Sequence, residues 1–189
     1  PKAAGTSIEE TFVNAGYKMT FRRGGVYGPL NEFDKKNRCS PQHLHADLLE
    51  KHFGDSHFDL CFTVVRHPIE RLISEFKFRT NGDHPFMQDK SLDEFALSAI
   101  KQYPKTPSML DNHIRPQEQF LWRDCDVIRL EEGLSKVAQL VFHINGDKLD
   151  FSTKPKMKSK LQTNLNLSPE AEKNVRRFYK SDFLRFDYG

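Results

Sequence analysis

Cysteine is scarce in this sequence, and the three residues present, Cys39, Cys61 and Cys125, form no Cys-x-x-Cys pair. Their wide spacing and odd number predict neither a disulfide framework nor a thiolate zinc site. An excess of one charge sign is also lacking, since the formal net charge is +3 over 189 residues. This balance argues against a general nucleic-acid binder and leaves room for a local basic cleft. No apolar run is long enough to span a bilayer.

Two further signatures are absent. The G-x-x-x-x-G-K-[ST] pattern of an ATPase or GTPase phosphate loop does not occur. No secretory signal peptide is visible, but the chain lacks an initiator methionine and begins inside a loop motif. We therefore expect an upstream segment that supplies the strand leading into this loop.

Apolar periodicity predicts strands that alternate with helices. The continuous apolar run 59–65 fits a buried parallel strand, and 126–130 and 17–21 are typical of shorter strands. Helices are expected at 7–16, 40–52, 68–80, 91–100, 132–142 and from 168 onward. Loops are expected at 22–38, 81–90, 102–115 and 148–167. The alternation predicts one α/β domain over residues 1–189, with a central parallel sheet flanked by helices.

The opening segment, residues 1–7, combines small residues with one lysine and two hydroxyls before a predicted helix. Small residues let a backbone approach its ligand closely. The unpaired amides and the dipole at a helix start favour an anion such as phosphate or sulfate. Lys2 adds a positive charge, and Thr6 and Ser7 add hydroxyl donors. The alternative is an ordinary strand-to-helix turn with a solvent-exposed lysine.

A second segment follows the strand predicted at 59–65. Arg66 stands at its carboxyl end, where open α/β sheets bind ligands, and Ser74 lies on the next predicted helix. Arginine offers a planar fork that matches a phosphate, and a serine hydroxyl can complete the contact. The alternative is an ion pair between Arg66 and Glu70, with Ser74 as a small packing residue.

These two segments together resemble the phosphate-binding motifs of the sulfotransferase superfamily. The resemblance implies a P-loop-NTPase-like fold and 3′-phosphoadenosine 5′-phosphosulfate (PAPS) as the sulfate donor, without a metal. It assigns Arg66 and Ser74 to the 3′-phosphate of PAPS. It assigns a further group to the 5′-phosphosulfate, namely Lys2, Ala4, Gly5, Thr6 and Ser7.

His43 and His45 form a His-x-His pair with three interpretations. A metal site needs further ligands, which the sequence does not show, and two surface or packed histidines are the common case. The third interpretation is a general base, for which imidazole is the natural group near neutral pH. The uronyl 2-O branch of the carbohydrate sulfotransferases carries a similar pair, which implies that His45 is the base and His43 a second site residue. A helix would point the two side chains apart, whereas an extended chain would place them on one face.

The segment 111–117 is similar to a His-x-x-Pro-Gln block of the Golgi carbohydrate sulfotransferases. The resemblance makes His113, Arg115 and Gln117 candidates for acceptor binding, against the alternative of a polar loop. That family carries a Cys-x-x-Cys nearby, whereas Cys125 stands alone here. The departure favours a reducing compartment, hence a cytoplasmic and microbial protein, with the Golgi lumen as the alternative for a eukaryotic one.

The basic run 154–160 is either a solvated charge cluster or a loop that closes over the nucleotide. In sum, the sequence predicts a sulfotransferase that moves a sulfuryl group from PAPS to a hydroxyl of a glycan or small molecule, with neither nucleic acid nor a membrane span involved. The alternatives are a kinase on the same fold and a non-catalytic nucleotide- or glycan-binding module.

Overall fold

The computed structural model describes residues 1–21, 32–80, 90–151 and 165–189. Most of the loop expected at 81–90 and the basic run 154–160 lie outside these described residues. The α-helices are α1 (Gly5–Asn14), α2 (Glu32–Asn37), α3 (Ala46–Phe53), α4 (Pro68–Thr80), α5 (Leu92–Gln102), α6 (Ser135–Asn145), α7 (Pro169–Phe178) and α8 (Lys180–Arg185). The 3-10 turns are η1 (Pro41–His43), η3 (Gln117–Phe120) and η4 (Leu130–Glu132), and the strands are β1 (Phe62–Val65) and β2 (Asp126–Arg129).

The two strands pair in parallel, from Phe62 opposite Asp126 to Val65 opposite Arg129. This confirms the strands predicted at 59–65 and 126–130, and it makes the chain an α/β protein dominated by helices. The strand expected at 17–21 is wrong: no strand is assigned there. The amide of Tyr17 instead donates to the Phe12 carbonyl at 3.0 Å, so this segment closes the end of α1.

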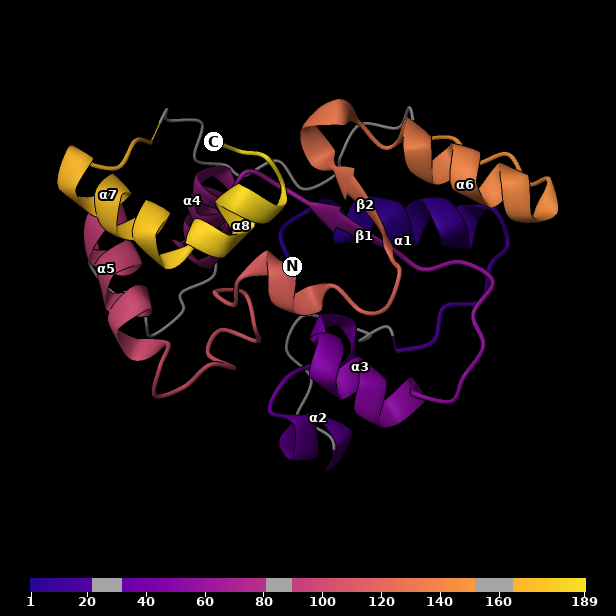
Figure 1. The fold of residues 1–189 in the computed structure, drawn as a ribbon, viewed down its shortest axis with the longest axis horizontal. Helices are drawn as coiled ribbons and strands as arrows, with labels where there is room; N and C mark the ends of the chain where they lie inside the picture. Colours follow the sequence, from indigo (N-terminus) through magenta and orange to yellow (C-terminus); the bar gives the residue numbers. More distant parts are fainter. Residues whose placement is uncertain (22–31, 81–89, 152–164) are drawn as a thin grey trace.

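The helices lie in three places around the strands, with α2 and α3 together at the bottom of the view (Figure 1). Helices α4, α5, α7 and α8 gather on one side, and α1 and α6 lie near β1 and β2. The main core lies in the first group, because α4 packs on α5 and α7 and these two also contact each other. In the sequence, apolar residues recur with helical spacing along 69–76 and predict an apolar stripe. The stripe is confirmed on α4, since Leu72, Ile73 and Phe76 are buried in this core.

Two predicted helices are interrupted. The one expected at 40–52 consists of η1 and α3, separated by Leu44 and His45 in extended backbone. The last helix divides into α7 and α8 at Tyr179, whose hydroxyl donates to the Ile114 carbonyl at 2.8 Å. Helix α2 also falls inside a segment expected to be a loop. Tertiary contacts therefore decided these boundaries.

The caps show which local signals hold. Ser91 and Glu94 form the predicted capping box of α5, and the Ser168 hydroxyl accepts from the Ala171 amide. The Ser-x-x-Glu spacing of Ser7 and Glu10 likewise predicts a capping box, and this prediction is wrong, because α1 already begins at Gly5. Ser7 therefore lies inside the first turn.

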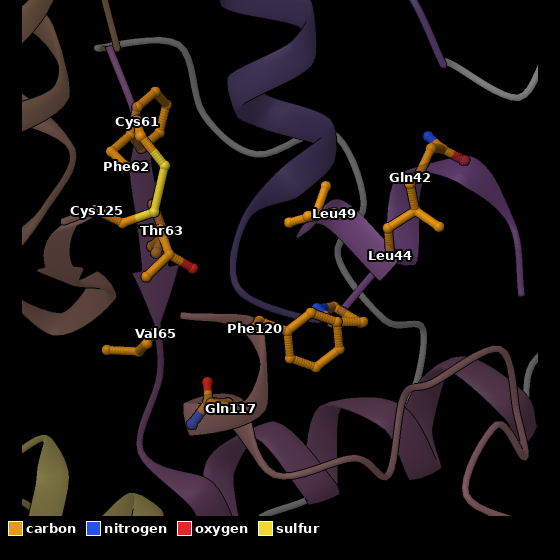
Figure 2. A pocket seen from close by; sticks show the side chains of 12 residues that line it. Gln42, Leu44, Leu49, Cys61, Phe62, Thr63, Val65, Gln117, Phe120 and Cys125 are labelled. Atoms are coloured by element: carbon orange, nitrogen blue, oxygen red, sulfur yellow. A yellow bond between two sulfur atoms is a disulfide. The ribbon is translucent and has the colours of Figure 1, made fainter. Parts of the chain in front are cut away.

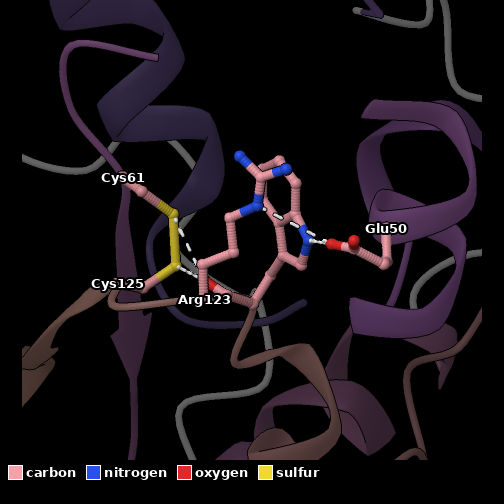
Figure 3. Close-up of a disulfide and its surroundings, with 5 residues drawn as sticks. Glu50, Cys61, Arg123 and Cys125 are labelled. Atoms are coloured by element: carbon pink, nitrogen blue, oxygen red, sulfur yellow. Dashed lines mark hydrogen bonds and ion pairs between the residues drawn. A yellow bond between two sulfur atoms is a disulfide. The ribbon is translucent and has the colours of Figure 1, made fainter. Parts of the chain in front are cut away.

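A disulfide joins Cys61 to Cys125 (Figure 3). The expectation of no disulfide is therefore wrong, and so is the argument for a reducing compartment that rested on it. The parallel register explains the pairing: each cysteine stands one residue before its strand, the Asp126 amide donates to the Cys61 carbonyl, and the two Cα atoms are 4.7 Å apart. None of the described helices combines the length and apolar character needed to cross a membrane.

Candidate functional site

The amino end of α1 presents unpaired backbone amides. The first intrahelical bond runs from the Ile8 amide to the Ala4 carbonyl at 3.0 Å, so the amides of Gly5, Thr6 and Ser7 precede the hydrogen-bonded ladder. Ala4 holds a left-handed backbone with φ of 62°, which turns the chain sharply into the helix. A Cβ added at Gly5 would meet no atom within 4 Å, so there is open space beside this amide row.

Lys2 lies beside α4, where its ammonium sits 3.9 Å from the centroid of the Phe78 ring. Burial lowers the pKa of Lys2; Glu75 opposes this shift, and the positive charges of Arg79 and Arg66 add to it. The charge on Lys2 therefore interacts with charged residues of α4 and with Arg66, which follows β1. Lys2 and Arg66, which come from the two segments singled out in the sequence, therefore influence each other through their charges.

Gln117 fixes the backbone of Arg66. Its side chain accepts from the Arg66 amide at 2.9 Å and donates to the Arg66 carbonyl at 2.8 Å. The Gln117 amide in turn donates to the buried carboxylate of Asp182 at 2.8 Å. Gln117, which sequence reasoning made an acceptor ligand, thus supports the backbone at the carboxyl end of β1.

The Arg66 guanidinium is partly exposed and lies 3.4 Å from the Glu70 carboxylate, one turn into α4. Ser74 lies one turn further along this helix, half-buried and with no hydrogen-bond partner among the described residues. The ion pair foreseen as the structural alternative is therefore present. An exposed i,i+4 pair of this kind is weak, so a phosphate can compete for the arginine.

His43 is held by a carboxylate from a distant segment. Its Nδ1 lies 2.8 Å from Oδ2 of Asp111, and the Ser40 hydroxyl donates to the same oxygen at 2.8 Å. The Ser40 amide donates to the other oxygen of Asp111 at 2.6 Å. Burial favours the neutral acid, but hydrogen bonds and charge from His43 and donation by Ser40 outweigh it and lower the pKa of Asp111. Asp111 is therefore an anion that orients the imidazole.

His113 packs against His43, with the ring centroids 4.6 Å apart and the planes nearly perpendicular. On its other side Nδ1 lies 2.5 Å from the Glu75 carboxylate, whose second oxygen accepts from Arg79 at 2.6 Å. Burial lowers the pKa of His113 to about 4, against the opposing charge of Glu75. A neutral His113 that donates from Nδ1 leaves its buried Nε2 without a partner in the described part of the chain.

His45 lies at the start of α3, two residues beyond His43. Its Nδ1 is buried without a hydrogen bond and lies 3.8 Å from the exposed carboxylate of Asp47. Burial, followed by the charge of Arg115, lowers the pKa of His45, and Asp47 opposes the shift. Arg115 itself donates to Asn112 at 3.0 Å and to Gln119 at 2.7 Å.

A cavity of about 230 Å³ is lined by Gln42 and Leu44, the neighbours of His43 in the chain, whereas His43 and His45 are not among its lining residues. Figure 2 shows Leu44 and Leu49 lining it on one side, Val65 and Thr63 of β1 on the other, and Phe120 between them. Gln42 and Pro1 also border it, so it reaches both the histidine segment and the opening loop. Its lining combines apolar side chains with the polar groups of Gln42, Thr63 and Gln117.

Comparison with known families decides the class of the protein. The model of the sulfotransferase family matches residues 1–189. The chain belongs to the sulfotransferase family. No curated protein and no solved structure matches it.

Two carboxylates of this sulfotransferase were not selected from the sequence. Asp111 lies in the segment 111–117, whose alternative interpretation is a polar loop, and Glu75 lies in the helix predicted at 68–80 without a role of its own. Each meets a histidine from another segment, at distances that no local pattern encodes. Leu110, Asp111 and Asn112 have a left-handed backbone, which is uncommon outside glycine and often marks functional sites. This conformation is not visible in the sequence.

Proposed function

We propose that this sulfotransferase moves the sulfuryl group of PAPS to a hydroxyl of a carbohydrate, on a P-loop-NTPase-like fold. The proposal rests on the open amide row at the start of α1, with Lys2 just before it in the chain, and on Arg66 at the carboxyl end of β1, whose charge acts on Lys2. These features offer two places for an anionic group, one at the amide row and one at Arg66. A nucleotide with phosphates at its 3′ and 5′ positions can occupy both.

The residues fit such a donor. Open space beside Gly5 lets an anion reach the amides of Gly5, Thr6 and Ser7. The Arg66 guanidinium offers a bidentate fork for a phosphate. Ser74 lies on α4, eight residues after Arg66, and its hydroxyl has no partner among the described residues. PAPS supplies the activated sulfuryl group when it is bound. Lys2 then stabilises negative charge that develops on the phosphate side of the transferred group.

The acceptor hydroxyl needs a base, and the geometry favours His43 over His45. Asp111 holds the proton of His43 on Nδ1. The other ring nitrogen of His43 has no hydrogen-bond partner among the described residues, and it can receive the hydroxyl proton. The imidazolium formed this way is stabilised by the Asp111 anion, as in other carboxylate–histidine pairs. His45, kept neutral by burial, is proposed to contact the acceptor.

Nucleotide binding and transfer test this function separately. Calorimetry with 3′,5′-ADP and with ATP distinguishes a sulfotransferase from a kinase, because only the first should bind 3′,5′-ADP more tightly. Arg66→Ala is expected to weaken that binding, whereas Lys101→Ala, an exposed lysine on α5, should not. Tighter binding of ATP would contradict the proposal.

Sulfate transfer to a panel of glycans and small alcohols separates an enzyme from a binding module. Lys2→Ala should abolish turnover, because it removes the charge that stabilises the phosphate side of the transferred group. His43→Ala should also abolish turnover, since a general base contributes about 10²–10⁴-fold. Asp111→Asn should lower kcat more than it changes KM. Full transfer by His43→Ala with loss in His45→Ala would reassign the base to His45.

A further inference from the structure

Three side chains of the site form a cluster that metal ions favour. His43, Asp111 and His113 each offer a ligand atom, and these atoms all lie within 4.8 Å of one another. We propose that this cluster binds one divalent transition-metal ion, with Zn²⁺ as the best match. The sequence showed a histidine pair without further ligands, and the fold supplies both an aspartate and a second histidine.

His113 gives the independent evidence for a ligand. It is only 8% exposed, and its buried Nε2 has no hydrogen-bond partner among the residues that the structure describes. Leaving a buried polar atom unpaired is costly. Glu75 accepts at Nδ1, which fixes the proton there and leaves Nε2 as a lone pair. A carboxylate behind a metal-binding imidazole is the usual outer support of such ligands.

The spacing suits a tetrahedral ion after small side-chain shifts. Bonds of about 2.1 Å to zinc place tetrahedral ligand atoms about 3.4 Å apart. In the cluster, Nδ1 of His43 lies 2.8 Å from Oδ2 of Asp111, and the ligand atoms are at most 4.8 Å apart. An ion bound by both atoms takes the place of the proton on Nδ1, which is released to solvent. The backbone is already fixed, because Asn112 donates to the His43 carbonyl at 2.9 Å and the Ser40 amide holds Asp111.

The donor set selects the class of ion. Two imidazole nitrogens and one carboxylate oxygen suit zinc, copper or nickel, whereas magnesium and calcium prefer all-oxygen sites. Three protein ligands leave a fourth position for water. Zinc is favoured among these because it accepts a tetrahedral set without a geometric preference of its own.

Direct titration tests the site. Calorimetry of the full chain, stripped with EDTA, should show one Zn²⁺ bound per chain, and Co²⁺ should give a visible absorption band of a low-symmetry nitrogen–oxygen site. His113→Asn places an amide nitrogen where Nδ1 stands, so it keeps a donor for Glu75 and deletes Nε2. This variant should weaken zinc binding at least about 10-fold.

Asp111→Asn is the second variant, since asparagine tolerates the left-handed backbone at this position. It should also weaken zinc binding at least about 10-fold, whereas His143→Ala, an exposed histidine on α6, should leave it unchanged. Thermal melting verifies that each variant is folded. Absence of saturable binding, or wild-type affinity in a folded His113→Asn or Asp111→Asn variant, overturns the proposal.

A consequence for transfer rests on the proposed function. An ion bound by His43 competes with proton transfer to this imidazole, so zinc should inhibit sulfate transfer and EDTA should restore it. Zinc binding is measured without an activity assay, so the metal site and the role of His43 as the base can be refuted independently of each other. Stoichiometric zinc binding with undiminished transfer would refute His43 as the base and leave the metal site intact.

Discussion

Replacement of Glu75 by glutamine tests the buried charge network behind the histidines. The Glu75 carboxylate is 1% exposed and accepts from Arg79 at 2.6 Å and from His113 at 2.5 Å. Glu75→Gln keeps the shape and removes the charge, which leaves the buried Arg79 cation without its counter-ion. Breaking a buried pair by changing one partner costs about 3–5 kcal/mol of unfolding free energy.

The lowered pKa of Glu75 gives a second estimate of this cost in unfolding free energy. Burial alone would raise its pKa, but the charge and hydrogen bond of His113, followed by those of Arg79, lower it from 4.5 to about 2. That difference corresponds to about 3 kcal/mol. Because the pKa is lower in the folded state, the stabilisation is present above about pH 4.5 and is lost as the pH falls towards 2.

Urea unfolding at pH 7 and at pH 3, in the presence of EDTA, measures both effects. The variant should be about 3 kcal/mol less stable at pH 7, and the difference from the wild type should shrink at pH 3. Glu172→Gln is the matched control, since Glu172 and Arg176 form an exposed i,i+4 pair at 2.8 Å on α7. Its cost should stay below about 1 kcal/mol. Equal costs for Glu75→Gln and Glu172→Gln, or a difference independent of pH, would refute the reasoning.

Three other substitutions probe the supports of the site by the same unfolding assay. The double variant Cys61→Ser and Cys125→Ser should lose about 4 kcal/mol, because the disulfide closes a loop with a sequence separation of 64 residues; a reductant should then affect only the wild type. Gln117→Leu leaves the amide and carbonyl of Arg66 unpaired and should lower the free energy of unfolding by about 1–3 kcal/mol for each group. It should also weaken 3′,5′-ADP binding. Unchanged affinity would show that Gln117 does not support the nucleotide site. Ser91→Ala removes the cap of α5 and should cost about 0.5–2 kcal/mol without altering that affinity.

Local patterns predicted the parts of the fold that local energetics control. The apolar run before Arg66 became β1, the stripe on α4 entered the core, and Ser91 and Ser168 capped their helices as expected. Predictions failed where a distant contact outweighed the local preference. The segment 17–21 turns back on α1 instead of pairing as a strand, and the last helix breaks at Tyr179, whose hydroxyl is bound by Ile114.

The disulfide is a second feature that local sequence patterns did not predict. Cys61 and Cys125 are isolated in the sequence, and each has an ordinary local context. Only the parallel pairing of β1 with β2 makes them neighbours. Sequence spacing alone therefore could not reveal the pair.

The sequence by itself determined the family and the order of its two candidate phosphate-binding segments, because residues 1–7 and the segment from Arg66 to Ser74 each carry a local pattern. The tertiary structure decided which carboxylates meet the histidines. Asp111 reaches His43, and Glu75 reaches His113, across long stretches of chain. Such contacts depend on how helices and loops pack, and no periodicity or capping rule encodes them.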